Sequence, residues 1–128
     1  MSPPRKRRTR IQMRFRLKEA DDQLMAIFDG EDSLRNSLLS GFLDSSKYFV
    51  VDILYDISRV EQGLYSSYAH ENPKVYIELF KDHITIEPYV GENETEIPMV
   101  EIPLEKAKLL LFEWGVALQR WRMKRKKP

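Results

Sequence analysis

Apolar and polar residues alternate strictly in the segment IQMRFRLK, residues 11–18. A period of two predicts an antiparallel strand with one face on the core and the other in water. The residues expected on the core face are Ile11, Met13, Phe15 and Leu17.

Residues 19–45 carry weaker patterns. The stretch DDQLMAIF fits either a helical turn or a second strand, and DGED is a turn signal. In SLRNSLLSGFL, Leu34, Leu38 and Phe42 fall at helical spacing. This spacing predicts a short helix, although Gly41 lowers the helix propensity of the segment.

The segment from Ser46 to Gly63 predicts a better defined helix. A serine at the first position can cap a helix by accepting a backbone N–H bond, and a glycine at the end can adopt the left-handed conformation that terminates one. The β-branched residues leave a strand alternative open over residues 48–54. The expected buried stripe is Val50, Ile53, Leu54, Ile57 and Val60.

The segment KVYIELFKDHITIEP predicts a hairpin that reverses at Lys81-Asp82. After the polar loop GENETE, the segment PMVEIP is expected to add a short strand, and its flanking prolines favour an edge position. The residues expected on the buried face of the hairpin are Val75, Ile77, Leu79, Ile84 and Ile86.

A long amphipathic helix is predicted after Pro103, because proline suits the first turn of a helix. Its stripe gives both tryptophans a core role, with Trp121 less covered than Trp114. The stripe consists of Leu104, Ala107, Leu111, Trp114, Leu118 and Trp121, widened by Leu110 and Ala117.

Together these elements predict an α+β fold: an antiparallel sheet of about four strands with helices packed on one face and a long C-terminal amphipathic helix. We expect residues 1–10 to form a disordered basic arm, residues 11–122 a single domain, and residues 123–128 a basic tail. The apolar runs are too short to span a membrane, and no apolar segment follows the charged N-terminus, so a cytoplasmic protein is expected.

Charge is distributed unevenly along the chain. The formal net charge is +1, but residues 11–119 hold ten basic and twenty acidic side chains, a net of −10. The ends hold the remaining basic residues and no acid. The candidate polyanion-binding residues in these ends are Arg5, Lys6, Arg7, Arg8, Arg10, Lys124, Arg125, Lys126 and Lys127.

The sequence offers little for catalysis or metal binding. It has no cysteine, and its histidines, His70 and His83, lack partners at ligand or triad spacing. We interpret both as surface residues, one in a polar loop and one at the hairpin reversal. Asp52 and Asp56 lie four residues apart on one predicted helix face, a spacing that is common on solvated faces. We therefore expect no enzymatic activity, no cofactor and no metal.

An acidic segment follows the hairpin and predicts either a solvated loop or a docking surface for a basic protein, where complementary charge would speed association. Tyr89 adds an aromatic side chain that could anchor such a partner. The acidic candidates are Glu92, Glu94, Glu96 and Glu101 of this segment, together with Asp82 and Glu87 of the hairpin.

The order of elements from Val51 to Trp121 resembles the small immunity proteins of bacterial contact-dependent and polymorphic toxin systems. The resemblance is carried by Gly63 at a helix end, the hairpin 75–87, Ile102-Pro103-Leu104 at the opening of the last helix, and Glu113-Trp114 within it. It implies a stoichiometric inhibitor of a cognate toxin, with no chemistry of its own. It assigns no functional residue.

Two other functions compete with this one. A nucleic-acid-associated protein could bind RNA or DNA through its basic N- and C-terminal arms, with a strong dependence on salt. Alternatively, the chain could be an assembly subunit whose basic arms bind the acidic body of a neighbouring copy.

Overall fold

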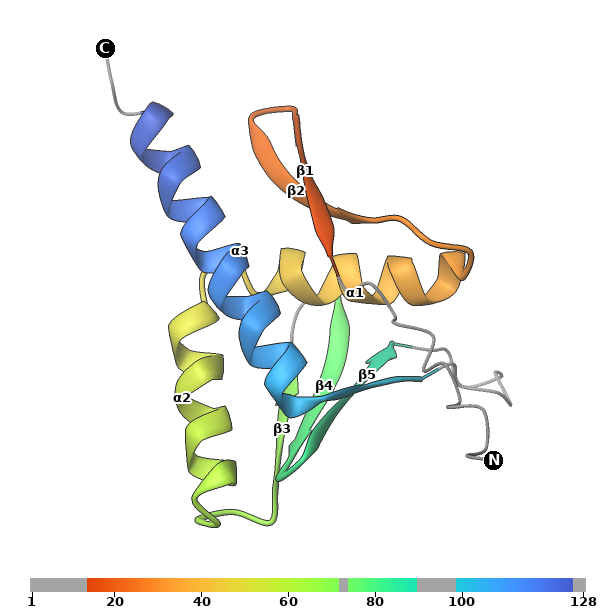
Figure 1. Ribbon diagram of the computed structural model, residues 1–128, viewed down its shortest axis with the longest axis vertical. Coiled ribbons are helices and arrows are strands. Elements are labelled where there is room, and N and C mark those ends of the chain that lie inside the picture. The colour runs from red at the N-terminus through yellow and green to blue at the C-terminus, as the bar shows by residue number, and fades with distance from the viewer. Residues whose placement is uncertain (1–13, 72–73, 90–98, 126–128) are drawn as a thin grey trace, which may run out of the picture.

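The structure is a computed structural model that describes residues 14–71, 74–89 and 99–125. These residues form three helices and two antiparallel sheets, which confirms the predicted α+β class (Figure 1). The predicted arm, residues 1–10, lies outside the described residues. In chain order the elements are β1 (Phe15–Ala20), β2 (Gln23–Phe28), α1 (Ser33–Ser45), α2 (Val50–Glu61), β3 (Ser67–Glu71), β4 (Val75–Phe80), β5 (His83–Pro88), β6 (Val100–Pro103) and α3 (Leu104–Arg125).

The larger sheet has the strand order β3-β4-β5-β6, so each strand pairs with its neighbour in sequence. The predicted hairpin is confirmed as β4 and β5, with Leu79 opposite Ile84 across the ladder. The predicted edge strand is confirmed as β6. Every core residue of β4, β5 and β6 lies on one face, against which α1, α2 and α3 pack. These residues are Val75, Ile77, Leu79, Ile84, Ile86, Val100 and Ile102.

The fourth strand of this sheet, β3, was not predicted, because its sequence SYAHE lacks strongly apolar residues. Tyr68 pairs with Leu79 and His70 with Ile77, so these two side chains share the inner face of the sheet. The prediction that His70 lies in a polar loop is therefore wrong.

The N-terminal strand forms a separate two-stranded sheet with β2, which resolves DDQLMAIF as a strand. The connecting residues Asp21 and Asp22 have φ angles of 51° and 60°, the left-handed values that tight hairpin turns require. Leu24, Ala26 and Phe28 of β2 are buried, and Phe15 packs on them from β1. Of the other residues predicted on the core face, Leu17 is 50% exposed, because it borders a groove between the β1–β2 hairpin and α3 and is not part of the core. Ile11 and Met13 lie outside the described residues.

The predicted short helix is confirmed as α1, with Asp32 as its N-cap, accepting the N–H of Arg35 at 3.1 Å. Leu38 and Phe42 are buried as predicted, whereas Leu34 is half exposed. Gly41 has a packing role: a Cβ at this position would lie 3.3 Å from Val75 of β4, so the glycine lets the helix approach the sheet closely.

Ser46 does not cap the following helix, which corrects the prediction. Its hydroxyl donates to the carbonyl of Phe42 at 2.6 Å and so satisfies the end of α1. Helix α2 begins later, after Phe49, and the strand alternative for residues 48–54 is wrong. Its stripe is confirmed: Leu54 is partly buried, and Val50, Ile53, Ile57 and Val60 are buried. Gly63 has a φ of 79°, and Leu64 donates to the carbonyl of Arg59 at 3.0 Å, as in a glycine-terminated helix.

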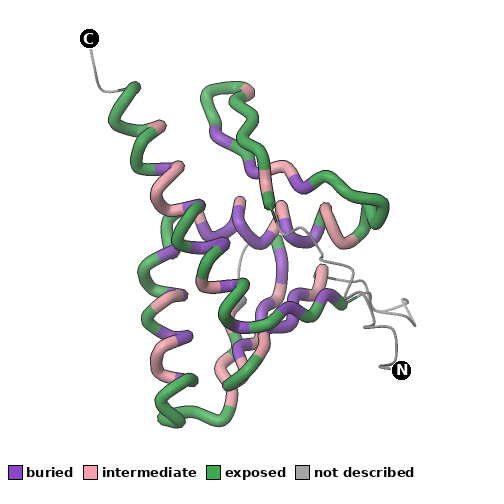
Figure 2. Tube along the Cα trace, in the orientation of Figure 1, coloured by how far each residue is buried: buried purple, intermediate pink, exposed green. Residues whose placement is uncertain are grey.

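Helix α3 buries the predicted stripe and ends at Arg125, within the segment predicted as a tail. Figure 2 shows the buried residues concentrated where the helices meet the sheet. Trp114 is completely buried, and its ring packs edge-on against the ring of Phe15, with the ring centroids 5.9 Å apart. Trp121 is partly covered, as expected. Among the described helices, none has the length and apolar content needed to cross a membrane.

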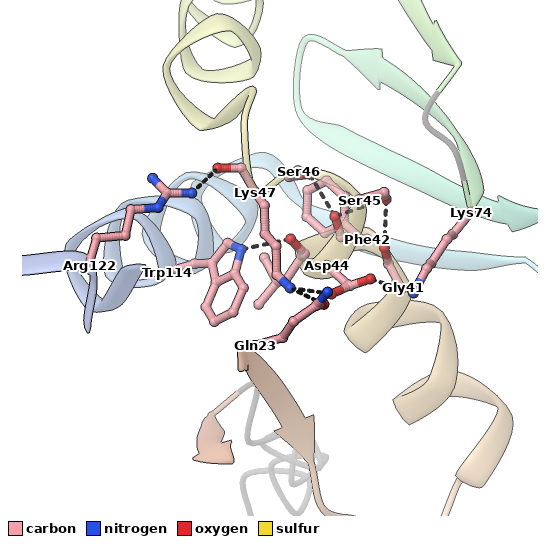
Figure 3. Close-up of polar contacts among 11 residues, drawn as sticks. Gln23, Gly41, Phe42, Asp44, Ser45, Ser46, Lys47, Lys74, Trp114 and Arg122 are labelled. Atoms are coloured by element: carbon pink, nitrogen blue, oxygen red, sulfur yellow. Dashed lines mark hydrogen bonds and ion pairs between the residues drawn. The ribbon is translucent and has the colours of Figure 1, made fainter. Parts of the chain in front are cut away.

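The C-terminal end of α1 is the junction of the fold (Figure 3). The indole N–H of Trp114 donates to the carbonyl of Leu43 at 2.6 Å. Next to it, Asp44 pairs with Lys47 at 3.0 Å and with Lys74, which precedes β4. Burial alone would raise the pKa of Asp44, but the hydrogen bonds and charges of the two lysines lower that pKa below its ordinary value.

Candidate protein-interaction surface

Among the described residues, those on the outer face of the larger sheet, opposite the helices, add no side chain to the hydrophobic core. Strand alternation places Glu78 of β4, Thr85 of β5 and Glu101 of β6 in one cross-strand row on this face. Tyr76 lies opposite Glu87 in the next row. The face is therefore polar and acidic. Tyr76 lies in the row on one side of Glu78, and Phe80 of β4 lies in the row on the other side.

Carboxylates dominate this face. Glu78, Glu87 and Glu101 project from successive strands, and Asp82 lies at the β4–β5 reversal with its side chain 86% exposed. We name these four residues the acidic sheet face. Thr85 separates Glu78 from Glu101 across the sheet, so the like charges do not face each other directly.

His83 organises one end of this face. Its ring stacks on Phe80 with centroids 4.5 Å apart, and its Nδ1 lies 2.6 Å from Asp82. Its Nε2 lies 3.3 Å from Glu101. The hydrogen bond from His83 is the main reason that the pKa of Asp82 lies below its ordinary value. His83 therefore fixes two carboxylates rather than acting as an isolated surface residue.

The structure brings together half of the predicted acidic candidates. Asp82, Glu87 and Glu101 share the outer face, and Tyr89 follows β5 as an exposed side chain. Glu92, Glu94 and Glu96 lie outside the described residues. Sequence reasoning missed Glu78, although it alternates with the buried residues of β4 and the strand period alone places it on the outer face.

The second histidine forms a separate polar contact on the inner side of the sheet. His70 Nε2 lies 2.5 Å from Asp56 Oδ2, and the ring centroids of His70 and Tyr68 lie 5.1 Å apart. The pair joins α2 to the edge strand β3. Asp52 is exposed and takes no part in it, so the two aspartates do not act as a carboxylate pair. Across the described ranges, no cluster of histidine, aspartate and glutamate has the composition to hold a metal ion.

The described part of the basic C-terminal end folds against the β1–β2 hairpin. Arg125 pairs with Asp22 at 3.2 Å and with Glu19 at 3.6 Å, and it lies over the ring of Trp121 at 4.8 Å. Lys124 is exposed. The remaining polyanion candidates, Arg5, Lys6, Arg7, Arg8, Arg10, Lys126 and Lys127, lie outside the described residues.

Comparisons of the chain with protein-family models, with curated proteins and with solved structures found no match.

Proposed function

We propose that this chain is a non-catalytic protein-binding module that neutralises a basic protein, specifically a nuclease toxin, in the manner of the small immunity proteins it resembles. The acidic sheet face is the observation that carries this proposal. On this face the strands set the positions of the glutamates, and His83 contacts Asp82 and Glu101.

The chemistry of the face suits such a partner. A nuclease is basic where it binds nucleic acid, so four carboxylates on one rigid face would compete for that surface by mimicking phosphate charge. Complementary charge raises the association rate and discriminates against acidic partners. The half-buried rings of Tyr76 and Phe80 supply apolar contact area between the charges, and tyrosine is enriched among the residues that dominate binding energy.

The proposal is tested by titrating the full chain with the toxin domain encoded by the neighbouring gene, using calorimetry at low and at high salt. We expect a one-to-one complex per chain whose affinity falls as salt rises. The double variant Glu87→Lys/Glu101→Lys should bind at least tenfold more weakly, because two attractive charges become repulsive.

A matched control separates the face from overall charge. The double variant Glu31→Lys/Asp52→Lys makes the same change in net charge at exposed positions in the loop before α1 and on α2. It should bind within about threefold of the unchanged chain, since charges far from an interface are largely screened. Failure to form a complex, or equal weakening by both double variants, would refute the proposal.

A further inference from the structure

Helix α3 has a second apolar stripe on the side opposite its core-facing stripe. Leu109, Phe112 and Met123 are 50%, 63% and 61% exposed, and Val116, between them, is partly exposed. The successive spacings are three, four and seven residues, which keep these side chains on one helix face. We name these four residues the outer stripe. The core does not use them, so their burial needs another partner.

Apolar residues from α2 and its N-terminal approach extend the surface. Tyr48 and Val51 are 80% and 78% exposed, and they lie across a groove of about 730 Å³ from Phe112 and Met123. Gly115 contributes to this geometry: a Cβ there would lie 3.2 Å from Val50, so α2 and α3 approach closely and form one surface. A contiguous exposed apolar surface of this kind marks an interaction site.

We propose that the outer stripe is a self-association surface on which a second copy of the chain docks its own α3, antiparallel to the first. The stripe is self-complementary under a two-fold axis at Val116. Leu109 and Met123 each lie seven residues from Val116, in opposite directions. The axis therefore places Val116 against its counterpart and Leu109 of each copy against Met123 of the other.

Charge selects the antiparallel orientation. Glu113 and Arg120 lie on the same flank of the outer stripe, and the two-fold axis brings Glu113 of each copy next to Arg120 of the other. On the opposite flank, Lys108 is already paired with Glu61 at 3.0 Å within its own chain. A parallel pair would instead place the two basic C-terminal ends side by side. Those ends contain Arg120, Arg122, Lys124 and Arg125 in each copy.

The inference does not rest on the proposed function. The acidic sheet face lies on the outer side of the sheet, whereas the outer stripe points away from the sheet on the other side of the helical layer. A copy bound at one surface leaves the other accessible.

Cysteine cross-linking of the full chain tests the arrangement directly, because the native sequence contains no cysteine. A Val116→Cys variant should form a disulfide-linked dimer on mild oxidation, since the two-fold axis brings the two thiols together. Leu109→Cys and Met123→Cys should not link to themselves, because an antiparallel pair separates identical residues by about 14 helical steps, roughly 21 Å. A mixture of these two variants should form the mixed dimer.

Sedimentation gives the second measurement, on the chain without cysteine. We expect a species of twice the 15.2 kDa chain mass at concentrations of tens of micromolar. Phe112→Ser/Met123→Ser should raise the dissociation constant of the dimer at least tenfold. The control Leu34→Ser, at a half-exposed leucine on α1, should leave that constant unchanged. Glu113→Arg should raise the dissociation constant of the dimer about fivefold, and Glu113→Arg/Arg120→Glu should return it to the value of the unchanged chain.

A monomer at all these concentrations would overturn the proposal, as would a dimer unaffected by Phe112→Ser/Met123→Ser. Self-linking of Leu109→Cys would show parallel pairing and overturn the antiparallel arrangement. Far-UV circular dichroism checks that each variant is folded. If Val116→Cys does not fold, the mixture of Leu109→Cys and Met123→Cys decides the question, because both positions are exposed.

Discussion

Replacing Trp114 by phenylalanine should destabilise the protein strongly, because this side chain joins α3 to the end of α1. The change deletes the hydrogen bond from the indole N–H to the Leu43 carbonyl, 2.6 Å long and buried. It also removes one ring of a side chain that has no exposed surface. The Leu43 carbonyl keeps a second partner, the N–H of Ser46 at 3.1 Å, so it is not left unsatisfied.

The magnitude follows from three contributions. The lost hydrogen bond is worth about 1 kcal/mol when the acceptor keeps another donor. The smaller ring buries roughly 40 Å² less apolar surface, or about 1 kcal/mol. The cavity left behind, roughly 40 Å³, costs about another 1 kcal/mol. We therefore expect the free energy of unfolding to fall by about 3 kcal/mol, a large share of the stability of a typical domain.

Urea denaturation followed by far-UV circular dichroism measures this loss. With a slope of about 1.5 kcal/mol per molar for a domain of this size, the midpoint should fall by roughly 2 M. Trp121→Phe is the matched control on the same helix. Its N–H donates to the exposed carboxylate of Glu19 at 3.0 Å, so the change should cost less than about 1 kcal/mol. Equal losses for the two variants, or a loss below 1 kcal/mol for Trp114→Phe, would refute the reasoning.

Two further predictions concern the termini of α1 and α2. Gly63→Ala should lower the free energy of unfolding by about 1 kcal/mol, because its φ of 79° is strained for any residue with a Cβ, whereas Gly30→Ala should have little effect on the urea midpoint. Because the pKa of Asp44 is lower in the folded chain, the unfolded chain binds a proton at this carboxylate more readily. The stability that Asp44 gains from its lysine contacts is therefore present above pH 3.8, and it is lost as pH falls through the lower folded-state pKa. Asp44→Asn should therefore flatten the acid limb of a plot of urea midpoint against pH, and superimposable plots would contradict this assignment.

Periodicity predicted the elements whose apolar residues are strong and regular. The stripes of α2 and α3 and the alternation of β4 and β5 are explicit in the sequence, because each buries one face against the same core. The strand β3 escaped detection because its inward residues, Tyr68 and His70, are not clearly apolar. Ser46 was assigned to the wrong helix because a hydroxyl can accept from the helix that follows or donate to the helix that precedes, and residue type does not distinguish the two.

The candidate interaction surface, like the fold, was predictable from sequence only where strand periodicity alone determines it. Alternation around the buried residues of β4 suffices to place Glu78 on the outer face, so this member of the acidic sheet face was accessible from sequence. The contact of His83 with Glu101 was not accessible, because Glu101 belongs to a different strand and its register is a tertiary property. Pairing of β1 with β2 in a sheet of their own likewise depends on which surfaces the helices cover.

The order of strands in the larger sheet has a kinetic consequence. Because every ladder joins strands that are consecutive in sequence, no pairing has to wait for a distant segment, and low contact order favours rapid folding. The β4–β5 hairpin closes over a two-residue reversal and should form within about 1–10 µs. The contacts that span the chain belong to α3: Trp114 reaches back 71 residues to Leu43, and Trp121 reaches back 102 residues to Glu19. Docking of α3 is therefore the step that should limit the folding rate, and side-chain truncations at its core-facing positions should slow folding more than truncations in β4 or β5.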